Sequence, residues 1–370
     1  MKKQLARKLS SPINQFNQPV ERLFPLDLLK AMSITAVVSY HSVFVPRSTY
    51  TASLLPMDTL FASLRFCVPV LFTISFLLFE RGLTNHSTET AWPLIKKRLV
   101  RLAIPTVFWF SLTAGLKLLK GDDLPEIISA VLNGTIFYDA YYLIVILQFI
   151  PVFIWLRHWF SKLHNVLVTV VLQCLVFLLI YTALSMHFAP QLIAVLRTID
   201  RPLFLYWFGY MALGCYFWKT WPLVVKISCR IPTQFKIFAL GLSCLLLASE
   251  YHRLFLVSGG QIPPFDYATL SSILSVVVIF LCFASVESDQ LPLPLKKGVL
   301  LLSQYSLGIF CINGFISELF FSFGSHQFRG ATFNLVEMLV MKFVGWGILL
   351  TLSLALSVLL DRIGLRACVR

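Results

Sequence analysis

The sequence predicts an all-α, polytopic membrane protein, a bundle of about ten transmembrane helices. Hydrophobic residues make up 58% of the chain and charged residues only 13%, which is too few charges to cover the surface of a soluble domain. The apolar runs have the length of a membrane-spanning helix, about 20 residues, and they lack the alternation of barrel strands. Because backbone polar groups must be paired in hydrocarbon, these runs are expected to be helices.

Ten apolar runs define the expected helices, and a further segment, 124–140, is amphipathic and has the pattern of a re-entrant or interfacial piece. The runs fall near 26–46, 60–80, 99–119, 141–157, 166–187, 203–219, 236–256, 268–286, 299–321 and 335–360. No connection between them is long enough to fold as a separate soluble domain. We therefore expect one transmembrane domain over 26–361, a basic cytoplasmic tail over 1–25 and a short cytoplasmic tail over 362–370.

The orientation of the helices is predicted by Lys and Arg residues, which gather in alternate connections. This basic set contains Arg81, Lys96, Lys97, Arg98, Arg157, Lys162, Lys219, Lys226, Arg230, Lys236, Lys296 and Lys297. Both tails add cations on the same side, so both termini are expected in the cytoplasm. The net charge of +14 follows from this topology, and no nucleic-acid partner is expected, because no continuous basic surface can form on such a chain. The eight cysteines form no CxxC pair, so no metal site is expected.

The first apolar run, LDLLKAMSITAVVSYH, places Asp27, Lys30 and His41 on one stripe of a helix. Lys30 and His41 are separated by three turns, about 16 Å along the axis. In one interpretation, Asp27 and Lys30 anchor the helix at the interface and His41 makes an interhelical hydrogen bond. In the other, Lys30 holds an anionic donor at the cytoplasmic mouth, and the neutral imidazole of His41 accepts a proton from an attacking hydroxyl.

The start of the third run, KKRLVRLAIP, carries a pair of arginines on one helix face, Arg98 and Arg101. They are either an ordinary positive-inside cluster or a phosphate site, because guanidinium groups bind phosphate bidentately. In the second run, Arg65 lies toward the outer side, where it either snorkels to the interface or serves a site. Further ionisable residues near the outer ends of the runs are Glu250, Glu318 and Lys342.

Several of these segments together resemble the bacterial membrane-bound acyltransferases of acyltransferase family 3, which O-acylate sugars of the cell envelope. LDLLKAMSITAVVSYH is similar to the family's opening helix, in which a basic residue precedes a histidine by ten intervening positions. Arg98-Leu99-Val100-Arg101 followed by Ile104-Pro105 is similar to its paired-arginine motif. The remaining similar segments are VPVLFTISFLL (68–78), AYYLIVILQFIPVF (140–153) and SQYSLGIFCIN (303–313). The resemblance runs from about Arg22 to the last helix.

Three positions depart from the family pattern. Lys30 stands where arginine is usual, Phe76 where glycine is usual, and Asn313 where a late-helix motif usually ends in histidine. Lys30 keeps the charge but loses the bidentate fork of arginine. Asn313 forms hydrogen bonds but is neither an acid nor a base at neutral pH. These departures leave open an altered donor or a branch of the family that has lost catalysis.

The resemblance implies an enzyme of a bacterial cytoplasmic (inner) membrane with no permanently bound cofactor. Its co-substrate is then a cytoplasmic acyl-CoA, commonly acetyl-CoA, and its acceptor is a hydroxyl of an envelope glycan or lipid-linked sugar, with membrane lipid around it. Lys30, Arg98 and Arg101 are expected to hold the phosphates of the CoA. His41 is expected to be the general base, with Asp27 as an orienting acid. Arg65 and Asn313 are the expected substrate-binding residues.

Two other functions compete with this prediction. Intramembrane charges also suit a transporter or flippase for a glycan or small molecule, which moves its substrate without covalent change and needs no CoA. A structural or regulatory subunit derived from the same fold is the third alternative, and the Lys30 and Asn313 departures are what favours it.

Overall fold

The computed structural model describes residues 22–84, 88–186, 188, 190–199, 201–202, 206–260, 263 and 265–370, and over these residues the protein is helical without a strand. Each of the ten apolar runs contains a helix. These helices are α2 (Phe24–Tyr40), α4 (Cys67–Leu83), α5 (Thr88–Lys120), α7 (Tyr141–Leu156), α8 (Leu163–Ser185), α10 (Phe208–Lys219), α12 (Thr233–Val257), α13 (Leu270–Phe283), α15 (Ser306–Gln327) and α16 (Leu335–Arg362). The shorter helices are α3 (Thr51–Ala62), α6 (Leu124–Leu132), α9 (Pro190–Ile199), α11 (Trp221–Arg230) and α14 (Leu293–Gln304).

Within the described residues, six segments are long and apolar enough to cross a membrane. They are Arg47–Leu83, Ala91–Lys120, Leu163–Ser185, Thr233–Val257, Ser306–Gln327 and Leu335–Arg362. α7 and α13 are apolar but shorter, and α2 and α10 have only 17 and 12 residues. The prediction of a helical, multi-pass membrane protein is therefore confirmed, whereas a count of about ten full-length spans is not.

Several predicted boundaries shift because local signals end the helices early. The run at 26–46 stops being helical after Tyr40, and an irregular segment follows that contains Pro46. Pro46 disfavours a helical conformation at Val45, so the helix does not resume there. The run at 299–321 is divided between α14 and α15 at Tyr305. Segment 124–140 consists of the nine-residue helix α6 followed by turns, and α6 buries Ile127 while most of its other residues are exposed.

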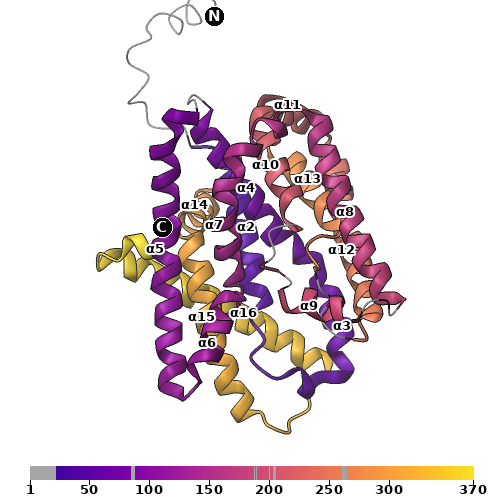
Figure 1. Ribbon diagram of the computed structural model, residues 1–370, viewed down its shortest axis with the longest axis vertical. Coiled ribbons are helices and arrows are strands. Elements are labelled where there is room, and N and C mark those ends of the chain that lie inside the picture. The colour runs from indigo at the N-terminus through magenta and orange to yellow at the C-terminus, as the bar shows by residue number, and fades with distance from the viewer. Residues whose placement is uncertain are drawn as a thin grey trace, which may run out of the picture.

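The helices divide into an interior and a lipid-facing periphery. Within its most apolar stretch, the Arg47–Leu83 segment is 67% buried, whereas the corresponding stretches of α5, α8 and α12 are 28% buried and that of α16 only 22%. The exposed residues of these four helices are mainly Leu, Val, Ile and Phe, as lipid contact requires. α5 lies at one edge of the bundle, and α8 and α12 lie at the other (Figure 1). α2 packs against α4, α14, α15 and α16 and so runs through the interior.

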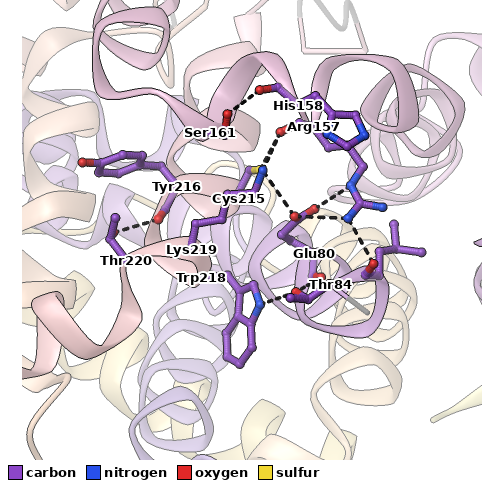
Figure 2. Close-up of polar contacts among 11 residues, drawn as sticks. Glu80, Thr84, Arg157, His158, Ser161, Cys215, Tyr216, Trp218, Lys219 and Thr220 are labelled. Atoms are coloured by element: carbon purple, nitrogen blue, oxygen red, sulfur yellow. Dashed lines mark hydrogen bonds and ion pairs between the residues drawn. The ribbon is translucent and has the colours of Figure 1, made fainter. Parts of the chain in front are cut away.

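We call the end of the bundle where α4, α7 and α10 finish the basic end. A buried carboxylate ties these three helices together there, as Figure 2 shows. Glu80 is 1% exposed; Arg157 Nε lies 3.2 Å from its Oε2 atom and Lys219 Nζ 3.5 Å from its Oε1 atom. Arg157 also donates to the carbonyl of Leu83 at 3.0 Å. The cluster fixes the framework on which the cavities described below are built.

Candidate active site

Two adjoining cavities open at the basic end, and together we call them the basic cavity. Their volumes are about 190 and 900 Å³, and Lys30, Arg101, Gln304 and Arg370 line both of them. The basic side chains that line one or both are Arg22, Lys30, Lys97, Arg98, Arg101, Arg366 and Arg370. The structure thus brings Lys30, Arg98 and Arg101 together, as the sequence predicted for an anion-binding group.

The cations of the basic cavity are poorly matched by acids. Arg98 is half-buried, donates to the carbonyl of Ser75 at 2.6 Å and lies over the Phe79 ring at 4.8 Å. Arg101 is exposed to the cavity mouth. Among the described residues that line the cavity, Asp27 is the single acid, so an anionic ligand would relieve the repulsion between these cations.

Asp27 belongs to the basic cavity and not to the surroundings of His41. Its carboxylate accepts hydrogen bonds from Arg22 Nε and from Ser303 Oγ, each at 2.5 Å. Asp27 lies near the start of α2, whereas His41 lies just after its end. The structure therefore places Asp27 where it orients the basic neighbour Arg22, and it does not bring Asp27 and His41 into one site.

The last residues of the chain complete the basic cavity. Arg370 Nη2 lies 3.0 Å from Asp361 Oδ2 and 2.8 Å from Tyr305 Oη. Two further hydrogen bonds attach this segment to the bundle. Gly308 N donates to Val369 O, and Trp109 Nε1 donates to Cys368 O, each at 3.1 Å. The sequence suggested only a short tail here. The sequence shows the basic residues of 362–370. It does not show that this segment folds back onto the bundle and brings Arg370 into the same cavity as Lys30.

A separate cavity of about 380 Å³ lies at the opposite end of α2, and we call it the histidine cavity. Its aromatic lining consists of Tyr40, Tyr50, Phe61, Tyr138, Tyr251 and Phe321, and its ionisable lining includes His41, Arg47, Asp58, Arg65, Arg201 and Lys342. A cavity with aromatic walls and a few placed polar groups is the usual form of a small-molecule site.

His41 is held in the histidine cavity by Asp139. The Nε2 atom of His41 lies 2.7 Å from Oδ2 of Asp139, and the imidazole stacks on the Tyr138 ring at 5.3 Å between ring centroids. An ionised carboxylate only accepts hydrogen bonds, so Nε2 carries the proton in a neutral imidazole. The Nδ1 atom, which has no hydrogen-bond partner in the described part of the chain, then keeps its lone pair and can act as a base.

The surroundings of Asp139 keep its carboxylate charged. Burial raises the pKa of this carboxyl group, but His41 and the guanidiniums of Arg201 and Arg65 outweigh burial and lower the pKa below its usual value. Asp139 lies in the connection before α7 with φ at 65°, an uncommon conformation for a residue other than glycine. In the sequence, Asp139 is one of several acids between the apolar runs, and its pairing with a residue 98 positions away leaves no local signal.

Arg65 is buried and does not snorkel to the interface. It is 8% exposed and forms an ion pair with Asp266, and its guanidinium lies over the Tyr251 ring at 4.0 Å. Arg201 bonds the same Asp266 carboxylate at 2.9 Å. Arg65 thus lines the histidine cavity, which is where a substrate-binding role would require it.

Asn313 lines neither cavity. It is fully buried in α15, and neither atom of its amide has a hydrogen-bond partner within the described residues. Along the same helix, Phe310 lines the basic cavity and Phe321 lines the histidine cavity. Asn313 therefore lies between the two cavities along α15.

His41 was expected to act together with the cations, but the structure places them in two cavities at opposite ends of α2, with a wall of side chains between them. Tyr138 lines the histidine cavity and Tyr142 lines the basic cavity, only four residues further along the chain. Tyr142 contacts Phe310 at 4.8 Å between ring centroids, and its hydroxyl lies 3.5 Å from Ser75 Oγ. These aromatic side chains form part of the wall, together with Leu71 on the side of the basic cavity.

The fold and the cavities define a multi-pass membrane protein with a cavity lined by cations at one end and an Asp–His pair at the other. A family model described as an acyltransferase domain matches residues 25–362. The chain belongs to this family, acyltransferase family 3, and the resemblance drawn from the motifs is confirmed. No curated protein and no solved structure matches the chain.

Proposed function

We propose that this membrane acyltransferase moves an acyl group, commonly acetyl, from a cytoplasmic acyl-CoA to a hydroxyl of an envelope polysaccharide or lipid-linked sugar. The observation that carries the proposal is that a cavity lined by cations and a cavity that contains the hydrogen-bonded His41–Asp139 pair lie at opposite ends of α2. Four residues, from Tyr138 to Tyr142, connect the lining of an anion-binding site with the lining of a site that contains a base.

The basic cavity suits the donor. CoA carries phosphates on its nucleotide half, and lysine and arginine side chains such as those around Lys30 bind phosphate. Arg98 and Arg101 supply planar guanidinium forks, while Lys30 supplies a point charge. The basic end then faces the cytoplasm, where CoA thioesters are made, and this agrees with the positive-inside rule in a bacterial inner membrane.

The histidine cavity suits the acceptor. The hydroxyl proton moves to Nδ1 of His41 while the hydroxyl oxygen attacks the thioester carbonyl, and Asp139 stabilises the imidazolium that forms. The carbon–sulfur bond then breaks, and the CoA thiolate takes the proton. The products are the ester and free CoA, so atoms and charge balance. For the two reactants to meet, the thioester must reach past Tyr142 along α2.

The departures at Lys30 and Asn313 are compatible with activity. Lys30 still lines both parts of the basic cavity, and Asn313 lines neither cavity, so its inability to move protons removes no base from either site.

The test is acyl transfer from radiolabelled acetyl-CoA in membranes that contain the wild-type protein or its His41→Ala variant. We expect label in glycan or lipid-linked sugar with the wild type, and a loss of about 10²- to 10⁴-fold with the variant. His252→Ala is the matched control, because His252 is a half-buried histidine hydrogen-bonded to Thr59 Oγ1 at 3.1 Å that does not line the histidine cavity. Full activity of His41→Ala would refute the assignment of the base.

A transporter is the competing function, because two cavities at opposite ends with a wall between them also suit alternating access. It predicts that a sugar crosses the membrane unmodified and without acyl-CoA. Mass spectrometry of envelope glycans with and without the protein separates the two, since only acyl transfer adds an acyl mass.

A further inference from the structure

Lys342 brings a buried ammonium group to the histidine cavity from α16. The residue is 4% exposed and lies within the Leu335–Arg362 membrane span. It is one of the lining residues of the cavity that contains His41. Burying a charge inside a membrane span is energetically costly. Such a residue is therefore expected to have an oppositely charged partner or a functional role.

The other cations of the histidine cavity have carboxylate partners. Arg47 pairs with Asp58. Arg65 and Arg201 share Asp266. Each of these acids is therefore already engaged, as is Asp139 by His41.

Lys342 differs from these arginines. Its Nζ atom donates to the carbonyl of Ser39 at 2.7 Å and lies 4.2 Å from the centroid of the Phe61 ring. No carboxylate of the described residues forms an ion pair with it. An ammonium group has three donors, so one carbonyl leaves most of its hydrogen-bonding capacity unused. Its charge is offset in part by the Phe61 and Tyr40 rings and, at longer range, by Asp58, which is already paired with Arg47.

We propose that Lys342 binds an anionic group carried by the acceptor, either a carboxylate or a phosphate. This inference rests on the proposed function and narrows its substrate class to acidic or phosphorylated sugars. Ser39 precedes His41 by two residues on the last turn of α2, so the anion bound by Lys342 would lie beside the base. A fixed anion there would orient the neighbouring hydroxyl toward His41.

A purely structural role makes a different prediction. The carbonyl of Ser39 lies in the last turn of α2 and also accepts a hydrogen bond from Ser42 Oγ at 2.8 Å. A lysine that caps such a carbonyl stabilises the helix. Loss of a cap lowers stability and weakens binding of every sugar alike. Loss of an anion site weakens binding of charged sugars alone.

The experiment is equilibrium binding to the full-length protein in detergent, without acyl-CoA, of three probes: methyl glucoside, methyl glucuronide and glucosyl phosphate. We expect the wild type to bind at least one charged probe about tenfold more tightly than methyl glucoside. This is the gain in affinity expected from one charge-assisted hydrogen bond. Lys342→Gln should remove this preference and Lys342→Arg should keep it. Lys236→Gln is the matched control, because Lys236 is a half-buried lysine bonded to Ser285 Oγ at 3.1 Å that does not line the cavity.

The two charged probes separate the sources of the anion. Tighter binding of methyl glucuronide indicates a sugar acid, and tighter binding of glucosyl phosphate indicates a phosphate-linked carrier. Equal or absent binding of all three probes to the wild type overturns the inference, and so does an equal loss of all three in Lys342→Gln. Because no acyl-CoA is present, such a failure leaves the result for His41→Ala untouched, whereas an inactive wild type in that assay refutes the proposed function itself.

Discussion

The Nε2 atom of His41 lies 2.7 Å from the Oδ2 atom of Asp139, which joins the end of α2 to the connection that precedes α7. This bond does two things. It fixes which imidazole nitrogen carries the proton, and it holds the ring against Tyr138 at the edge of the histidine cavity. An Asp–His pair of this kind prepares the second nitrogen to act as a base.

Asp139→Asn should reduce acyl transfer by about 10²- to 10⁴-fold, because the amide no longer selects the tautomer or stabilises the imidazolium. The measurement is the rate of transfer from radiolabelled acetyl-CoA, with protein abundance in the membrane determined in parallel. Glu126→Gln serves as the control, since Glu126 is an exposed acid of α6 that lines neither cavity. A rate within a factor of about two of wild type would contradict the assignment.

The sequence predicted the helices and the basic end because both follow from local properties. A run of about 20 apolar residues has few alternatives to a membrane helix. The alternation of Lys and Arg along the chain predicts the direction of each run. The stripe that joins Lys30 to His41 was also predictable, since it needs only the period of one helix.

The partners of these residues were not predictable, because they come from distant segments. Asp139 reaches His41 through the packing of two helix ends, and nothing near Asp139 in the sequence distinguishes it from Asp122 or Asp123. The acid assigned from the sequence, Asp27, was chosen because it shared the stripe of His41. Residues on one stripe of a helix face the same way, but they need not be close to one another. Asp27 and His41 are separated by nearly the whole length of α2.

Arg370→Gln should raise the KM for acetyl-CoA by about tenfold and leave kcat nearly unchanged, because it removes one charge-assisted contact to the donor. Arg370 lines both parts of the basic cavity, and Arg370→Lys should restore part of the affinity through its charge. The measurement is the dependence of transfer rate on acetyl-CoA concentration. Arg362→Gln is the matched control, an exposed arginine at the end of α16 that lines neither cavity. A fall in kcat with KM unchanged would instead assign Arg370 a structural role.

Glu80→Gln should lower the free energy of unfolding by about 3–5 kcal/mol, because it leaves the buried guanidinium of Arg157 without its carboxylate. Thermal unfolding of the purified protein in detergent measures the effect, and the exposed Glu287→Gln variant is the control. Activity per folded molecule should stay near wild type, since Glu80 lines neither cavity. Unchanged stability would mean that the carbonyls of Leu83 and Arg157, each 3.0 Å from one of the two cations, satisfy them without the carboxylate.

Tyr142→Ala should change which acyl groups are transferred, because Tyr142 forms part of the wall that the thioester must pass. Removing the ring leaves space for a longer chain, so the ratio of butyryl to acetyl transfer should rise by about tenfold, the discrimination that one or two methylenes provide. Phe153→Ala is the control, a fully buried aromatic residue of the same helix that lines neither cavity. It should lose stability to a similar extent without changing the ratio. An unchanged ratio in Tyr142→Ala would show that the acyl group takes another path between the cavities, and the wall assigned to Tyr142 would then have no part in the reaction.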